Sequence, residues 1–221
     1  AAGASQFQGL APLPLVPQEI QRVTQGAPAE TFLNQSFTPS LLLDRLADGQ
    51  INRVHVATHA EFLPGGPSKA KLFTGTEPFN LSRFAELRQR RSGEPIDLIT
   101  LSACRTALGD RDSELGFAGL ALQAGARSAI GTLWYVDDVA TSAFFVQFYR
   151  YLDQGLPKAE ALQATRIAMA RGQIRLQGDR ILGPNGSILL EGLTPTQQRR
   201  VSDGLSHPFF WSGITLLGTP W

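Results

Sequence analysis

The sequence predicts an α/β fold of three layers, in which helices cover both faces of a mostly parallel central sheet. Two runs, Arg53–Thr58 (RVHVAT) and Ile96–Leu101 (IDLITL), are short and apolar, which is typical of strands buried on both faces of a parallel sheet. An outer strand over 29–34 and a helix over 38–49 precede the first of these runs. A strand, a helix and a strand in this order favour a right-handed parallel crossover.

Caps and breakers place the elements of the first half of the chain. Thr38 is a preferred N-cap residue and Pro39 suits the first helical turn, so a helix is expected to start there. Prolines and glycines make the loop 64–67 too rich in breakers for regular structure. The elements expected are an extended entry (10–17), a helix (18–24), an outer strand (29–34), a helix (38–49), a buried strand (53–58), a short strand (71–75), a helix (82–91) and a second buried strand (96–101).

The second half of the sequence continues to alternate helices and strands, and a hairpin segment follows from residue 173. Asp137 and Asp138 put two carboxylates at the positive end of a helix dipole, so they are expected to open a helix. Asn185 and Gly186 lie at the centre of an alternating segment and predict a hairpin turn. The elements expected are a helix (114–124) closed by Gly125, a strand (129–133), two helices (139–152 and 158–171), the hairpin (173–190), a capped helix start (194–202) and a last strand (209–217).

We therefore interpret residues 1–221 as one domain with a late hairpin-containing insertion over residues 173–206. The small residues at the start, without a methionine, indicate a piece of a longer protein. No signal peptide is visible, which favours the cytoplasm, although a signal removed earlier would leave no trace.

Composition limits the possible functions. The 20 basic and 19 acidic residues give a net charge of +1, which argues against a nucleic-acid partner. Arg88, Arg90 and Arg91 form a local basic cluster, which we interpret as a solvated helix end. No window approaches the ~18 apolar residues of a membrane span. The single cysteine excludes an internal disulfide and a multi-cysteine metal site. Nucleotide-binding and serine-hydrolase motifs are missing, and no cofactor is predicted.

Cys104 and His59 are the candidate catalytic residues. Each follows one of the two buried strands, and the crevice beyond the carboxyl ends of such strands is where ligands bind. A cysteine attacks as its thiolate, so it needs a neighbour that lowers its pKa or removes its proton, and an imidazole does both. The alternatives are a small buried cysteine and a hydrogen-bonded structural histidine.

The other histidines and tryptophans are weaker candidates. His55 and His59 would lie ~13 Å apart along one strand, so they do not form a metal site together. His207 precedes a proline and is expected to be structural. Trp134 and Trp211 are either pocket residues or, more commonly for this residue type, part of the core.

Four blocks, VHVATHAEF, LSACRTALG, LQAGARSAIGTLWYVDD and HPFFWSGITLLG, resemble the CHAT domain family of caspase-like cysteine peptidases, which is related to caspases and separases. The resemblance extends over residues 10–221. It implies a caspase-like fold, a Cys104 nucleophile and a His59 base. It also implies that backbone N–H groups of Ala60 and Cys104 stabilise the oxyanion.

The same resemblance suggests a specificity. LWYVDD is similar to a stretch of separases in which an acidic residue lines the specificity pocket. It implies that Asp138, together with Asp137, recognises a basic side chain before the scissile bond, with Trp134 beside them. Capping of the helix that follows explains the two acids equally.

Three departures from the family pattern keep a second function open. Ala60 follows the histidine where glycine is usual, Arg105 follows the cysteine where an acid or amide is usual, and Ala107 replaces a common glycine. The leading hypothesis is a cysteine endopeptidase that cuts protein or peptide substrates. The alternative is a catalytically inactive interaction or signalling module of the same fold.

The family also suggests partners and a source. Its members commonly carry helical repeats that bind partners, usually upstream of the peptidase. The resemblance therefore suggests helical-repeat regions or regulatory proteins as partners of this domain. The hairpin around Asn185 is similar to an insertion in some bacterial, cyanobacterial-type members.

Overall fold

The structure is a computed structural model, and it describes residues 1–62, 69–103, 116–134 and 137–221. Cys104, Arg105 and Ala107, to which the sequence assigns roles, lie outside the described residues. None of the helices that the structure describes is long and apolar enough to cross a membrane.

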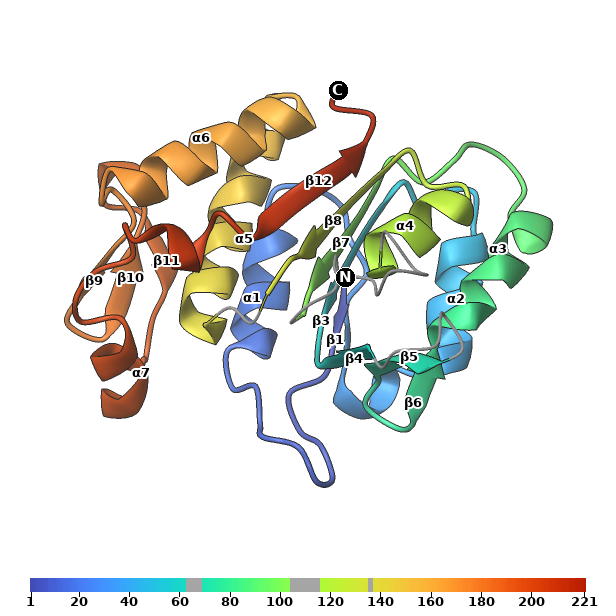
Figure 1. The fold of residues 1–221 in the computed structure, drawn as a ribbon, viewed down its shortest axis with the longest axis horizontal. Helices are drawn as coiled ribbons and strands as arrows, with labels where there is room; N and C mark the ends of the chain where they lie inside the picture. Colours follow the sequence, from blue (N-terminus) through green and yellow to red (C-terminus); the bar gives the residue numbers. More distant parts are fainter. Residues whose placement is uncertain (63–68, 104–115, 135–136) are drawn as a thin grey trace.

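The central sheet has six described strands in the order β12-β8-β7-β3-β1-β2 (Figure 1). All neighbours in it pair in parallel except β12, which runs antiparallel to β8. The strands are β1 (Ala2–Gly3), β2 (Phe32–Leu33), β3 (Arg53–Ala57), β7 (Leu98–Ser102), β8 (Ser128–Thr132) and β12 (Ile214–Gly218). The mostly parallel sheet predicted from the sequence is confirmed.

Strand β7 shows why the sheet needs cover on both faces. All five of its residues are buried. Leu98 belongs to one hydrophobic core, whereas Ile99 and Leu101 belong to the other. Successive side chains of a strand point to opposite faces, so a continuous apolar run fills both cores at once.

In the described part of the chain, helices cover both faces of the sheet, as Figure 1 shows. On one face lie α1 (Val16–Val23), α5 (Asp138–Asp153) and α6 (Lys158–Ala170), and on the other α2 (Pro39–Ala47), α3 (Phe84–Arg90) and α4 (Gly116–Gln123). The predicted cap of α2 is confirmed, because Thr38 Oγ1 accepts a hydrogen bond from the Leu41 N–H at 3.2 Å. Gly125 closes α4 with a φ of 101°, a conformation that favours glycine.

Among the described residues, two small antiparallel sheets flank the central one. The first holds β4 (Ala60–Phe62), β5 (Ala70–Phe73) and β6 (Pro78–Asn80), of which the sequence predicted only β5. The second holds β9 (Arg175–Gln177), β10 (Arg180–Leu182) and β11 (Ile188–Leu190), followed by α7 (Pro195–Arg200). Short single-turn 3-10 helices lie at η1 (Asn34–Ser36), η3 (Leu81–Arg83), η4 (Pro184–Gly186) and η5 (Pro208–Phe210).

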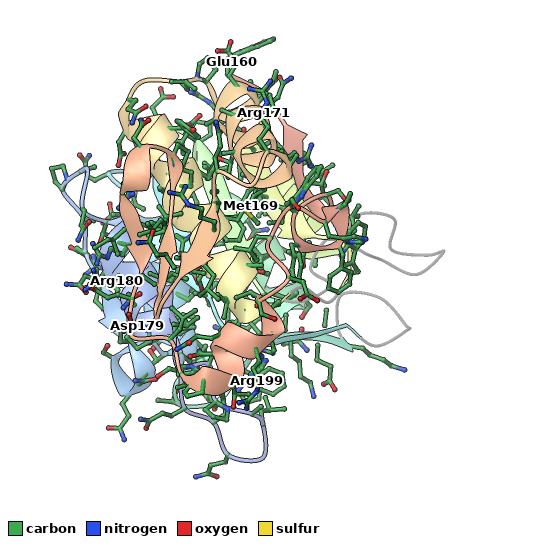
Figure 2. All side chains as sticks on the ribbon, turned by 90° about the vertical axis from the view of Figure 1, so that its left-hand side faces the viewer. Glu160, Met169, Arg171, Asp179, Arg180 and Arg199 are labelled. Carbon is green, nitrogen blue, oxygen red and sulfur yellow. The ribbon has the colours of Figure 1, made fainter. Side chains whose placement is uncertain are left out.

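The predicted turn at Asn185 and Gly186 joins β10 to β11, and both residues have positive φ, 63° and 74°. The single hairpin predicted for this segment was incomplete. A second tight turn, at Gly178 and Asp179, joins β9 to β10. Figure 2 looks onto this sheet, with Asp179 and Arg180 at its exposed turn.

The predicted last strand, 209–217, was wrong at its start. Pro208–Phe210 forms the 3-10 turn η5, and β12 begins only at Ile214. His207 Nδ1 accepts a hydrogen bond from the Phe209 N–H at 3.2 Å, which caps that turn. Proline suits the first position of a helical turn, so the His-Pro pair favours a turn over a strand at this point.

Candidate functional site

The carboxyl ends of β3 and β7 lie side by side, and residues at these two ends line a cavity of about 430 Å³. Ala57 pairs with Ser102, and the Thr58 N–H donates to the Ser102 carbonyl at 3.2 Å. His59 and Ala103, which follow the two strands, both line this cavity. Cys104 is the next residue after Ala103 and lies outside the described residues.

The His59 ring is held by two contacts from the segment that precedes α1. Its Nε2 lies 2.8 Å from the carbonyl oxygen of Ala11, and its ring centroid lies 4.7 Å from that of Phe7. A carbonyl oxygen only accepts, so Nε2 must carry the proton. In the neutral ring, Nδ1 then has the free lone pair that a general base requires.

The topology explains why residues 5–13 reach His59. β1 runs parallel to β3 and ends at the same edge of the sheet. The chain then loops out and returns, with the Leu13 N–H donating to the Ser5 carbonyl at 3.0 Å, before α1 begins at Val16. The sequence predicted an extended entry here. Its contact with the histidine was missed, since a backbone carbonyl carries no residue-specific signal.

Asp137 is the N-cap of α5, and Asp138 is the first residue of that helix. Asp137 Oδ1 accepts hydrogen bonds from the N–H groups of Val139 (2.9 Å) and Ala140 (3.2 Å). Burial raises the pKa of the Asp137 carboxyl above its ordinary value, while the Arg200 guanidinium and these two N–H donors act in the opposite direction. Both carboxylates line the cavity as well as opening the helix.

Arg200, the last residue of α7, contacts both of these carboxylates. Its Nε lies 3.2 Å from Asp137 Oδ2, and its Nη2 donates to Asp138 Oδ1. Arg200 also lines the cavity. The sequence did not predict this residue, because nothing local connects it with acids that lie some sixty positions earlier in the chain.

A buried polar cluster lies beside the cavity. Glu19 Oε1 lies 2.9 Å from His55 Nε2, and the Ser142 hydroxyl donates to Glu19 Oε2 at 2.5 Å. The three residues come from α1, β3 and α5, and Glu19 and Ser142 both border the cavity. Among the described residues, no three His, Cys, Asp or Glu side chains come together in a way that could hold a metal ion.

The remaining candidates are not among the described residues that line the cavity. The Trp134 indole packs over Gly213 and donates to the Phe209 carbonyl at 3.0 Å. Trp211 donates to the Ser206 carbonyl at 3.1 Å. Ala60, the first residue of β4, is paired with Leu72.

The comparisons with known proteins agree with this architecture. A family model described as the CHAT domain matches residues 1–219. The crystal structure of the Arg specific cysteine proteinase gingipain R superposes with a TM-score of 0.56 at 13% identity, over 99% of this chain and 46% of that one.

A complex of the pro- and mature domains of Porphyromonas gingivalis RgpB has a TM-score of 0.46 at 14% identity, over 74% of this chain and 42% of that one. The chain thus spans less than half the length of these solved structures. No curated protein matches the sequence. From the family match over nearly all of its length, the chain belongs to the CHAT domain family, and its fold is that of the caspase-like cysteine proteinases.

Proposed function

We propose that this chain is a cysteine endopeptidase that uses Cys104 as nucleophile and His59 as general base. One observation carries the proposal: the anchored His59 ring shares a cavity with Ala103, the residue to which Cys104 is joined. The Ala11 carbonyl fixes the proton on Nε2, which leaves Nδ1 to accept the thiol proton.

The proposed reaction has two steps. His59 takes the proton of the Cys104 thiol, and the sulfur attacks the carbonyl carbon of the scissile peptide. The C–N bond then breaks, and the imidazolium returns its proton to the leaving amine. Water, deprotonated by the same imidazole, hydrolyses the thioester and releases the acid and the free thiol.

The proposed substrate is a protein or peptide with a basic residue before the scissile bond. Asp138 and Asp137 line the cavity and are proposed to bind such a side chain, whereas Glu19, which also borders the cavity, is engaged by His55 and Ser142. The name of the structural neighbour, an Arg specific proteinase, is consistent with this choice. Trp134 is proposed to lie beside the bound side chain. The N–H groups of Ala60 and Cys104 are proposed to stabilise the oxyanion.

We also propose that residues 1–221 form a single peptidase domain with residues 173–206 as an insertion. The sheet of β9, β10 and β11, followed by α7, is the folded unit that corresponds to it. Through Arg200 this segment contributes to the cavity, so it is more than a surface addition.

Cys104 is the only cysteine of the chain, so the coupling of Cys104 and His59, the proposed catalytic dyad, can be tested directly. The purified protein is alkylated with iodoacetamide from pH 5 to pH 9, beside a His59→Ala variant, and modification is followed by intact mass. Coupling of the two groups makes the wild-type thiol react well below the ordinary midpoint of ~8.5, and the variant loses this reactivity. A Cys104→Ala variant measures the background.

The second experiment measures the cleavage of peptides that carry Arg or Lys before the scissile bond. Turnover that disappears in Cys104→Ala supports the peptidase. If wild type and His59→Ala react alike near pH 8.5 and no peptide is cut, the dyad is not functional. The chain is then an interaction module of caspase-like fold, an alternative that the Ala60 and Arg105 departures from the family pattern already raise.

A further inference from the structure

The acidic pair proposed to bind a basic substrate side chain already holds a basic side chain of this protein. Arg200 contacts Asp137 through Nε at 3.2 Å and Asp138 through Nη2. It reaches them from α7, the helix that follows the small sheet of β9, β10 and β11. Since all three residues line the same cavity, a guanidinium or ammonium that enters meets carboxylates that are already paired.

Asp137 and Asp138 together can still attract one further cation. Two carboxylates face one guanidinium, so the cluster of these three side chains keeps one formal negative charge. Asp137 Oδ1 is committed to the N–H groups at the start of α5, and Oδ2 faces Arg200. A second cation is therefore attracted to the cluster, and one that pairs with Asp137 Oδ2 and Asp138 Oδ1 takes the place of Arg200.

Arg200 can leave without unfolding its helix. The start of α7 is held by the reciprocal cap of Thr194 and Gln197, and its end by Val201, which is completely buried. The Arg200 side chain itself is 45% exposed, against 11% for Asp137 and 22% for Asp138. An ion pair with an exposed partner contributes little net free energy, because water and salt screen it. Replacement of the Arg200 guanidinium by that of a ligand therefore costs little free energy.

The geometry points to Arg200 as a specificity-determining residue that competes with the basic side chain of the substrate for Asp137 and Asp138. This inference rests on the function proposed for the acidic pair. It adds that the inserted segment regulates how tightly basic side chains bind, by offering an internal competitor. Removal of the Arg200 charge then strengthens the binding of basic ligands.

Neighbouring arginines provide a matched pair of variants. Arg200→Gln removes the competing charge, whereas Arg199→Gln makes the same change one residue away. Arg199 is exposed on α7, where it donates to Thr196 Oγ1 at 3.1 Å (Figure 2). Both variants change the net charge of the protein equally, so a difference between them reports on the position of the charge.

Binding is measured first, in the Cys104→Ala background, by isothermal titration calorimetry with agmatine, which carries the guanidinium of an arginine side chain. Displacement of one ion pair whose guanidinium is exposed corresponds to a gain of about two- to fivefold in affinity for Arg200→Gln. Arg199→Gln is expected to match its parent. Asp138→Asn is expected to weaken binding whether or not Arg200 is present.

Turnover is measured second, with the active thiol and peptides that carry Arg before the scissile bond. The expected result is a lower KM for Arg200→Gln with kcat unchanged. Equal or weaker agmatine binding by Arg200→Gln overturns the inference, and so does an equal gain in Arg199→Gln. If agmatine binds as expected while no variant cuts any peptide, the competition stands and the proposed peptidase activity fails.

Discussion

Replacement of Glu19 tests whether the buried cluster beside the cavity stabilises the fold. Glu19 is 1% exposed and His55 is 3% exposed. The carboxylate of Glu19 accepts from the Ser142 hydroxyl at 2.5 Å and lies 2.9 Å from His55 Nε2, so it ties α1 to β3 and α5. The segment before α1 carries the Ala11 carbonyl that holds His59.

The expected loss depends on what remains buried without a partner. Glu19→Ala leaves the His55 ring and the Ser142 hydroxyl without their acceptor, and each buried polar group left without a partner costs about 1 to 3 kcal/mol. His55 Nδ1 already has no hydrogen-bond partner within the described part of the chain, so the imidazole has no compensating bond to offer. Glu19→Gln keeps the shape and one carbonyl oxygen, and we expect a loss of about 1 to 3 kcal/mol.

The assay is urea unfolding followed by circular dichroism, with the slope of the transition checked for constancy. Glu160→Gln is the matched control, because Glu160 is exposed on α6 (Figure 2) and such changes stay within about 0.5 kcal/mol. A Glu19→Ala and Ser142→Ala double variant completes a cycle, and its loss should be smaller than the sum of the two single losses. A Glu19→Ala loss below about 1 kcal/mol would refute the reasoning.

Three further outcomes are expected. Arg91→Ala should cost about 2 to 3 kcal/mol in urea unfolding, because its guanidinium donates to the carbonyls of Leu46, Asp48, Ile51 and Glu94 at 2.8 to 2.9 Å. Arg90→Ala, which breaks only an exposed pair with Asp44, should cost under about 1 kcal/mol, and equal losses would contradict this account. Thr38→Ala should lower the free energy of unfolding by about 1 kcal/mol through loss of the α2 cap. An unchanged midpoint in thermal unfolding would argue against a stabilising cap. Burial raises the pKa of Tyr149 above its ordinary value near 10, so its stabilising contribution is complete below pH 10 and declines as pH rises further. Wild type should then lose stability relative to Tyr149→Phe by about 1.4 kcal/mol per pH unit above pH 10, and parallel pH profiles of the two proteins would exclude this.

Strong local signals made several elements predictable. The buried strands, the Thr38 cap, the helix opened by Asp137 and the turn at Asn185 each depend on residues within one short segment, and the structure has all four. The strands that were missed, β1, β4, β6 and β9, have two or three residues each. So short a run has too few residues to show a period of two, and its pairing partners decide its conformation.

The basic cluster at Arg88, Arg90 and Arg91 was predicted to be a solvated helix end, and the contacts of two of its members differ. Arg90 forms an exposed ion pair, which fits the expected solvated helix end. Arg91 instead bonds backbone carbonyls around the end of α2 and the loop after it, some forty residues earlier. Charge alone does not separate these two roles, because the difference lies in which carbonyls the tertiary fold brings within reach.

The sequence by itself predicted the layered fold and the two buried strands that His59 and Cys104 follow in the chain, because apolar runs and the breakers after them are local properties of the chain. Only the tertiary structure decided what surrounds His59: the Ala11 carbonyl that fixes its proton and the Phe7 ring beside it. It alone also brought Arg200 to Asp137 and Asp138. These contacts join segments far apart in the chain through backbone atoms and surface charges, which carry no sequence pattern. Packing of the sheet and its helices brings them together.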